Sequence, residues 1–275
     1  MTTLNWYQTD SEENYSTYNI GKLNYQKDEI QYKFNSMDYR CDEFTKTAEL
    51  PILFMGCSYT EGVGLPLNEV WAYHLHKKIV EVTNKNIPFW SIAKGGTSID
   101  YASRRFFELG YKLKPKYAFY LLSGISRREY CFETEKISVW FPKSTRFYKK
   151  SDSFTLMANI FADTEFAIHQ AYRSAMLLEA TAKLSDTKII IFDLPMDGII
   201  DDRKIKLFEK FENIEYVPLP DKDKRKTVEI VPNHIKNRPM RARDTEHPGA
   251  QWQYNLYDWI WQYIQQKGID KKLIE

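Results

Sequence analysis

Ile52-Leu53-Phe54-Met55-Gly56-Cys57-Ser58 is the stretch of this 275-residue sequence that decides the fold. Four apolar residues in a row, ended by a glycine, predict a short strand buried on both faces, as strands of parallel sheets are. The serine that follows predicts a tight turn from this strand into a helix. Because ligands of open α/β sheets bind at the carboxyl edge, Ser58 is a candidate nucleophile, with a plain turn serine as the alternative.

Helices and strands alternate along the rest of the chain. Apolar residues recur at helical spacing over 70–82, with Asn68 as the expected N-cap, and over 99–109, where Gly110 is expected to end the helix. Further helices are predicted at 165–184, at 201–211 and from about Gly249 onward, and further strands at 88–92, 117–122, 188–192 and 214–217. This alternation predicts a three-layer α/β/α sandwich with a parallel sheet of about five strands.

The predicted domain organisation is one domain with additions. Residues 1–48 are polar and rich in tyrosine, and they are expected to form an N-terminal extension, with a short strand at 31–34, on a domain of residues 49–275. Residues 127–163 and 218–243 fall outside the alternation of helices and strands. Because both are rich in charged and aromatic residues and follow predicted strands, we interpret them as insertions that shape a substrate cleft.

Charge and cysteine content limit the partners. With 39 Lys and Arg against 37 Asp and Glu, the net charge is +2, which gives no general attraction to nucleic acid or to an anionic membrane. Cys41, Cys57 and Cys131 are widely spaced and form no metal-binding pattern, so free thiols and no metal or organic cofactor are expected. A signal peptide and a membrane-spanning stretch are both missing from the pattern, which predicts a cytoplasmic protein. The oligomeric state stays open.

A second motif, Asp244-Thr245-Glu246-His247-Pro248-Gly249, stands just before the last predicted helix. A serine hydroxyl is a poor nucleophile until a base takes its proton, and that base is usually oriented by a carboxylate. Asp244 and His247, three residues apart in one loop, can supply both groups. The alternative is an N-capping acid beside a surface histidine, and Pro248-Gly249 at a helix start fits both interpretations.

Together the two motifs resemble those of the SGNH/GDSL hydrolases, over residues from about 50 to 265. That family has a Gly-Asp-Ser block after its first strand and an Asp-x-x-His block before its last helix. Here Gly56-Cys57-Ser58 and Asp244 to His247 stand at these places, and Gly62-Val63-Gly64-Leu65 continues the first block. The Gly-Cys-Ser form is similar to variants in phage and environmental bacterial sequences, so a phage-encoded or virion-associated protein is one expectation.

The resemblance implies a flavodoxin-like fold, with Ser58 as nucleophile, His247 as general base and acid, and Asp244 as the orienting carboxylate. The family's second block is similar to Ser91–Gly96. This similarity implies that the backbone N–H of Gly96, or of the neighbouring Gly95, joins that of Ser58 in an oxyanion hole.

The third block departs from the family's Gly-x-Asn-Asp and reads Gly124-Ile125-Ser126-Arg127. The family's asparagine donates to the oxyanion, and losing such a donor costs roughly 10²–10³ in rate. Ser126, or nearby Ser123, could replace it in part, and Arg127 could add charge or bind an acidic group of the substrate.

The other departures concern Cys57, which replaces an aspartate of the first block, and Ser91, which replaces an asparagine of the second. Cys57 is the alternative nucleophile. Tyr59 and Glu61 follow Ser58 and are expected, with Arg127, to bind substrate, although a solvated loop acid is the alternative for Glu61.

The expected function is hydrolysis of a short acyl ester, such as an acetyl ester on a carbohydrate or a small molecule. One alternative is a non-enzymatic or weakly active module that binds glycans or belongs to a virion. The other is an O-acyltransferase that uses the same triad.

Overall fold

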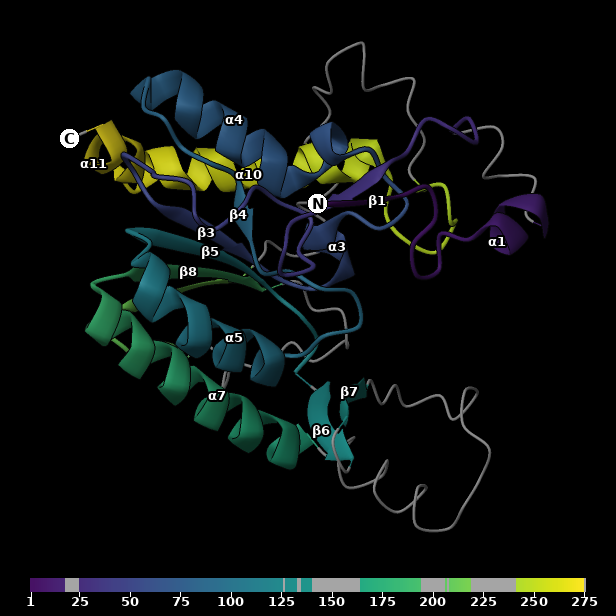
Figure 1. Cartoon of the computed structure of the whole chain (residues 1–275). Helices are drawn as coiled ribbons and strands as arrows, with labels where there is room; N and C mark the ends of the chain where they lie inside the picture. The colour runs from purple at the N-terminus through teal and green to yellow at the C-terminus, as the bar shows by residue number, and fades with distance from the viewer. Residues whose placement is uncertain are drawn as a thin grey trace. The chain divides into compact units, whose positions relative to one another are not determined.

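The computed structural model describes residues 1–17, 25–125, 127–132, 135–139, 164–193, 206, 208–218 and 241–274 (Figure 1). The helices are α1 (Glu12–Thr17), α3 (Ser58–Glu61), η1 (Leu67–Glu69, a 3₁₀ turn), α4 (Trp71–Thr83), α5 (Ile99–Leu113), α7 (Thr164–Ser185), α10 (Ala250–Gln266) and α11 (Ile269–Ile274). The strands are β1 (Thr2–Leu4), β2 (Tyr32–Phe34), β3 (Ile52–Met55), β4 (Trp90–Ser91), β5 (Tyr117–Leu122), β6 (Arg128–Phe132), β7 (Glu135–Val139), β8 (Lys188–Asp193) and β9 (Ile214–Pro218).

Five of these strands form one sheet in the order β4-β3-β5-β8-β9. They are the five strands that the sequence predicted, and β5 pairs with β8, and β8 with β9, in parallel. All residues of β3 and β5 are buried, which agrees with their uninterrupted apolar sequence. The predicted fold class, α/β with a five-stranded parallel sheet flanked by helices, is confirmed.

The chain divides into two compact units. The first contains Met1–Ile52, Ser58–Ser91 and Pro220–Glu275, and the second contains Leu53–Cys57 and Ile92–Leu219. The N-terminal residues 1–17 and 25–52 therefore share a unit with Ser58 and with the loop of Asp244 and His247.

In the second unit, α5 and α7 lie side by side (Figure 1). Their contact includes two hydrogen bonds, from Ser103 Oγ to the Ser174 carbonyl at 2.9 Å and from Ser174 Oγ to Asp100 Oδ1 at 2.6 Å. The prediction that Gly110 ends α5 is wrong, since the helix runs on to Leu113. Gly110 instead makes room for a neighbour, because a Cβ there would lie 2.6 Å from the ring of Phe106.

The described start of the 127–163 segment is a hairpin in which β6 and β7 pair antiparallel. The backbone N–H of Glu129 in β6 donates to Asp100 Oδ2 at 3.1 Å, and its carboxylate accepts two hydrogen bonds from Arg104. Both partners belong to α5, so the hairpin is fixed to the N-terminal half of that helix. The predicted insertion 218–243 lies largely outside the described residues, as does most of the helix predicted at 201–211.

In the first unit, α4 and α10 lie side by side (Figure 1). The prediction that Asn68 caps α4 is wrong, because Asn68 lies in the 3₁₀ turn η1 and the extended Val70 precedes the helix. The first helical N–H, that of Trp71, is satisfied from the neighbouring helix, since it donates to Gln253 Oε1 at 3.0 Å. As predicted, α10 begins immediately after Gly249.

Candidate active site

Ser58 occupies the position that the sequence indicated, three residues beyond β3 and at the start of the short helix α3. Its carbonyl accepts hydrogen bonds from the N–H groups of Gly62, at 2.8 Å, and of Val63, at 3.1 Å. These bonds close the turn, and the Ser58 side chain is 6% exposed. The turn therefore holds the serine between the end of a buried strand and the glycine-containing loop that follows.

Asp244 and His247 form a hydrogen-bonded pair. His247 Nδ1 lies 2.5 Å from Asp244 Oδ2, and Asp244 Oδ1 accepts the backbone N–H groups of Glu246, at 3.2 Å, and His247, at 3.1 Å. Asp244 is 1% exposed. Burial raises the pKa of this carboxyl, but the hydrogen bonds and the charge of His247 together lower it by more. The pKa of Asp244 therefore lies below its ordinary value. Asp244 is thus held as an anion that orients the imidazole.

The loop that carries this pair is tightly closed. Thr245 N–H donates to the Ala242 carbonyl at 3.0 Å, and Ala242 N–H donates to the His247 carbonyl at 3.0 Å. Thr245 has a φ of +63°, a conformation that β-branched residues rarely adopt. Such backbone strain persists where surrounding contacts enforce it, and it is frequent at functional sites.

The loop after Ser58 packs directly against the loop of the Asp–His pair. The Gly64 carbonyl accepts the N–H of Arg243 at 2.9 Å. Gly64 has a φ of +77°, and a Cβ at this position would lie 2.8 Å from the Cβ of Ala242 and 3.0 Å from Asp244 Oδ1. A glycine is required here for both reasons, so this contact joins the Ser58 motif to the motif of Asp244 and His247.

Tyr59, the residue after Ser58, lies against the imidazole of His247. The rings of Tyr59 and His247 meet edge to face, with centroids 5.7 Å apart, and Tyr59 contacts Trp252 in the same way at 5.6 Å. Gln253 Nε2 donates to the Tyr59 carbonyl at 3.1 Å, which ties the Ser58 turn to the first turns of α10. No hydrogen bond joins Ser58 Oγ to His247 among the residues that the structure describes. In free enzymes such catalytic hydrogen bonds are often long and tighten only when substrate binds.

Glu61, expected to bind substrate or to be solvated, is only 2% exposed. Its backbone carbonyl accepts from Arg40 Nη1 at 3.1 Å, and Gln8 Nε2 donates to its carboxylate at 3.5 Å. The buried Arg40 also donates to the carbonyls of Gly62 and Leu65. The alternative of a solvated acid is therefore wrong, while the substrate-binding role stays a prediction.

Apart from Ser91, the residues assigned to the second and third blocks lie in the other unit. Gly96 has a φ of +73°, with open space where a Cβ would stand. Arg127 Nη1 donates to the Thr97 carbonyl at 3.4 Å, so the two blocks are neighbours within that unit. Ser126 lies outside the described residues, and the oxyanion roles of Gly96 and Ser126 stay predictions. Cys57, the alternative nucleophile, is fully buried.

Several residues that support the site were missed from the sequence. Thr9 Oγ1 donates to Asp244 Oδ2 at 2.7 Å, and Arg243, the residue before Asp244, pairs with Asp10. Gln253 was not singled out either, although its amide bonds to both the Ser58 turn and α4. The sequence offers one signal for these residues, the position of Arg243 beside the candidate acid Asp244. It offers none for their contacts, because nothing in the sequence pairs residues so far apart.

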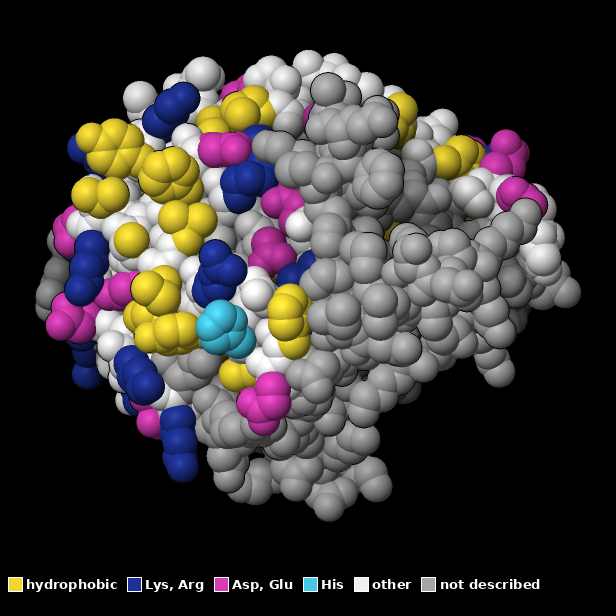
Figure 2. Space-filling view, turned by 90° about the horizontal axis from the view of Figure 1, so that it is seen from below, with side chains coloured by type: hydrophobic (Ala, Val, Ile, Leu, Met, Phe, Trp, Pro, Cys, Tyr) yellow, Lys and Arg dark blue, Asp and Glu magenta, His cyan; other side chains and the backbone are white. Residues whose placement is uncertain are grey.

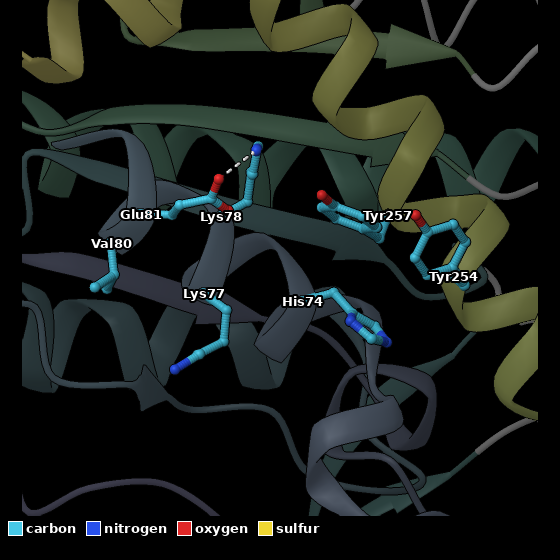
Figure 3. Close-up of a pocket in the computed structure, with 7 residues that line it drawn as sticks. All are labelled: His74, Lys77, Lys78, Val80, Glu81, Tyr254 and Tyr257. Carbon is cyan, nitrogen blue, oxygen red and sulfur yellow. Dashed lines mark hydrogen bonds and ion pairs between the residues drawn. The ribbon is translucent and has the colours of Figure 1, made fainter. Parts of the chain in front are cut away.

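A separate pocket of about 410 Å³ lies between α4 and α10 (Figure 3). From α10 come Tyr254 and Tyr257, whose rings contact each other and the ring of His74 from α4. Burial raises the pKa of Tyr257 to about 12. From α4 also come Lys78 and Glu81, which form an ion pair at 3.0 Å. None of these residues belongs to the triad loops, so the pocket is distinct from the triad.

Figure 2 shows basic and acidic side chains interspersed over the described part of one face. Among the described residues, no group of three or more His, Cys, Asp or Glu side chains is arranged to hold a metal ion. In the same residues, none of the helices combines the length and the apolar character needed to cross a membrane.

Comparison with known proteins gave matches only among solved structures. No family model and no curated protein matches the sequence. The esterase EstA from Pseudoalteromonas sp., inhibited by monoethylphosphonate, is 14% identical over 79% of this chain and 98% of its own, with a TM-score of 0.48. A GDSL-like lipase from Bacteroides thetaiotaomicron is 14% identical over 79% of this chain and 88% of its own, with a TM-score of 0.40. An α/β hydrolase from the metagenome of Lake Arreo is 12% identical over 85% of this chain and 100% of its own, with a TM-score of 0.47.

Proposed function

We propose that this chain is a serine ester hydrolase of the SGNH/GDSL type, with Ser58 as nucleophile, His247 as general base and acid, and Asp244 as the orienting carboxylate. The observation that carries the proposal is the buried Asp244, whose Oδ2 lies 2.5 Å from His247 Nδ1 while the ring of Tyr59 contacts the same imidazole. A histidine held through Nδ1 by a carboxylate presents Nε2 as the basic nitrogen.

The reaction then follows from the roles of these groups. Nε2 of His247 takes the proton of Ser58 Oγ as the oxygen attacks the acyl carbon, and the carbonyl oxygen becomes an oxyanion held by backbone N–H groups that include that of Ser58. When the ester C–O bond breaks, the leaving alkoxide takes the proton from His247. Water, deprotonated by the same nitrogen, hydrolyses the acyl-serine and regenerates Ser58.

For the substrate, we propose a short acyl ester, such as an acetyl group on a carbohydrate. The support is the aromatic pair of Tyr59 and Trp252 beside His247, with ring centroids 5.6 Å apart. Both rings are partly exposed. Aromatic faces beside a catalytic base offer apolar contact area to a sugar ring, which is itself partly apolar.

The alternative function is a binding module built on the same fold. The observation that favours it is the missing hydrogen bond between Ser58 Oγ and His247 in the described structure. The charged and buried state of Asp244 favours the enzyme instead, because burying an anion is costly and a surface of the binding type would not require it.

The test measures hydrolysis of p-nitrophenyl acetate and labelling by a fluorophosphonate probe in wild type, Ser58→Ala and Ser185→Ala. Ser185 is a matched control, since it is a buried serine at the end of α7 that bonds only to groups near it in the chain. We expect Ser58→Ala to lose both activity and labelling, while Ser185→Ala keeps both. A folded wild type that neither hydrolyses the ester nor reacts with the probe would count against the enzyme, and glycan binding would then be measured.

A further inference from the structure

A tight turn near the N-terminus, Tyr7–Asp10, faces the loop of the Asp–His pair. The turn is closed by reciprocal backbone hydrogen bonds, from Tyr7 N–H to the Asp10 carbonyl at 2.8 Å and from Asp10 N–H to the Tyr7 carbonyl at 3.1 Å. Gln8 takes a positive φ of 55° at its tip. This geometry presents the Thr9 hydroxyl and the Asp10 carboxylate as a rigid pair.

Asp10 anchors the turn through Arg243. The carboxylate accepts two hydrogen bonds from the guanidinium, Nε to Oδ1 at 2.8 Å and Nη2 to Oδ2 at 2.6 Å, and both residues are almost completely buried. Arg243 also donates to the carbonyls of Asn5 and Lys27, each at 2.7 Å, and its guanidinium lies 4.2 Å from the ring centroid of Trp6. Bidentate pairs of this kind fix orientation as well as distance.

A third connection runs through Tyr32 of β2. Its hydroxyl donates to Asp10 Oδ2 at 2.5 Å and accepts the N–H of Gly64 at 2.8 Å. Gly64 belongs to the Ser58 loop, and its carbonyl accepts the N–H of Arg243, the residue before Asp244. The N-terminal turn is therefore fixed to both triad loops, and the position of Thr9 is set by these contacts.

Thr9 contacts the orienting carboxylate itself. Its Oγ1 donates to Asp244 Oδ2 at 2.7 Å, and Oδ2 is the same oxygen that lies 2.5 Å from His247 Nδ1. With the two backbone N–H groups on Oδ1, the carboxylate accepts four hydrogen bonds, and three of them come from its own loop. Thr9 supplies the remaining one from the opposite end of the chain.

We propose that Thr9 is a positioning residue of the active site, whose hydroxyl fixes the Asp244 carboxylate and, through it, the ring of His247. The inference rests on the proposed hydrolase function and extends it to the N-terminal turn. The hydroxyl does two things. It prevents rotation of the carboxylate away from the imidazole. As a hydrogen-bond donor to Oδ2, it also reduces the negative potential of Asp244 at the His247 ring.

The other charged and titratable groups near Asp244 and His247 make no described hydrogen bond to Asp244 Oδ2. They are Arg243 and Asp10, which bind each other, and Tyr32, Tyr59, Glu61 and Glu246. Removing the Thr9 hydroxyl therefore leaves His247 Nδ1 as the only side-chain donor described on Oδ2. The carboxylate then attracts the imidazole proton more strongly, and His247 should accept its second proton at a higher pH.

The test compares wild type with Thr9→Val, Thr9→Ala and Thr9→Ser. The first two remove the hydroxyl, one with nearly equal volume and one without a methyl group against the carboxylate, and the third retains it. Thr83→Val is the matched control, because its hydroxyl bonds only to Ile79 of its own helix α4 and to the following turn. The titration midpoint of the His247 imidazole is followed by NMR with labelled histidine, assigned with His247→Gln, and kcat and KM are measured with p-nitrophenyl acetate.

We expect the His247 midpoint to rise in Thr9→Val and Thr9→Ala, and to return to the wild-type value in Thr9→Ser and in the control. We also expect kcat to fall on the order of tenfold at unchanged KM, since one hydrogen bond to a charged group is lost without any contact to substrate. An unchanged midpoint in folded Thr9→Val and Thr9→Ala would overturn the inference whatever the activity. Failure of the hydrolase function itself would be recognised separately, as wild-type activity that survives in Ser58→Ala or is missing altogether.

Discussion

The guanidinium of Arg243 and the carboxylate of Asp10 form a bidentate ion pair across 233 positions of the chain, with hydrogen bonds of 2.8 and 2.6 Å. The side chain of Arg243 is fully buried. Breaking such a pair on one side leaves an uncompensated charge in the interior, which typically costs about 3–5 kcal/mol. Variants of this pair therefore measure how much the contact of the N-terminal segment contributes to the stability of the first unit.

We expect Asp10→Ala to lower the free energy of unfolding by about 3–5 kcal/mol, measured by urea denaturation. Replacing both partners, as in Asp10→Leu with Arg243→Met, should recover most of the loss because no charge stays buried. Glu12→Gln is the control, since the Glu12–Lys27 pair is exposed and should contribute nothing measurable. A wild-type midpoint for Asp10→Ala would contradict the buried pairing.

Gly64→Ala should damage stability and activity together. The positive φ of 77° strains any other residue, and the added Cβ would press on Ala242 and on the Asp244 carboxylate. We expect a loss of more than about 2 kcal/mol in unfolding free energy and a lower kcat. Gly268→Ala is the control, because Gly268 has a similar φ of 64° and open space around it, so only about 1 kcal/mol of backbone strain is expected. Equal losses of unfolding free energy in the two variants would show that the added Cβ at Gly64 costs nothing beyond backbone strain.

The charge of Asp244 should make stability depend on pH. Burial raises its pKa, but the hydrogen bonds from His247 and Thr9 lower it further, so the folded pKa lies below 3.8. A carboxyl with a lowered folded pKa stabilises the protein above its unfolded pKa and loses this contribution as the pH falls through the folded value. The unfolding free energies of wild type and Asp244→Asn should therefore differ by the full amount above about pH 5 and converge as the pH falls below 3.8. If the difference in unfolding free energy grew with acidification, the pKa of Asp244 in the folded protein would not be lowered.

Cys57→Ala should retain ester hydrolysis to within a few-fold. The Cys57 side chain is completely buried, whereas the backbone next to it presents Ser58 at the start of α3. Iodoacetamide should likewise leave the native enzyme active, because a buried thiol reacts slowly. If Cys57→Ala were inactive while Ser58→Ala retained activity, the cysteine would be the nucleophile and the proposed mechanism would have to be rewritten.

The centre of the sheet could be predicted because β3, β5 and β8 are almost uninterrupted apolar runs. Residues 52–55 and 117–122 read as buried strands from composition alone, and they are buried along their whole length. Helix ends were less predictable. Gly110 reads as a stop signal but packs against Phe106 within α5, and Asn68 reads as a cap but lies in a 3₁₀ turn. At the start of α4 a tertiary contact overrides the local preference, because Trp71 N–H donates to Gln253 of α10 in place of a local cap.

The Asp–His pair could be predicted because both residues lie in one short loop, where spacing alone brings them together. Thr9, Asp10 and Gln253 could not, since each acts through a contact distant in sequence. Thr9 reaches Asp244 across 235 positions, and Gln253 reaches Tyr59 across 194. No periodicity or motif records such pairings, so a polar segment such as residues 5–10 looks dispensable until its partners are seen.

The pairing of Thr9 and Asp10 with Arg243 and Asp244 has a consequence for the order of biosynthesis. Residues 5–10 are synthesised well before their partners in 241–247, since 235 positions separate Thr9 from Asp244. The hydrogen bonds to the orienting carboxylate can form only after residues 241–247 have left the ribosome, so a shorter nascent chain has no assembled triad. Until then, a nascent polypeptide carries Ser58 without the base that would activate it.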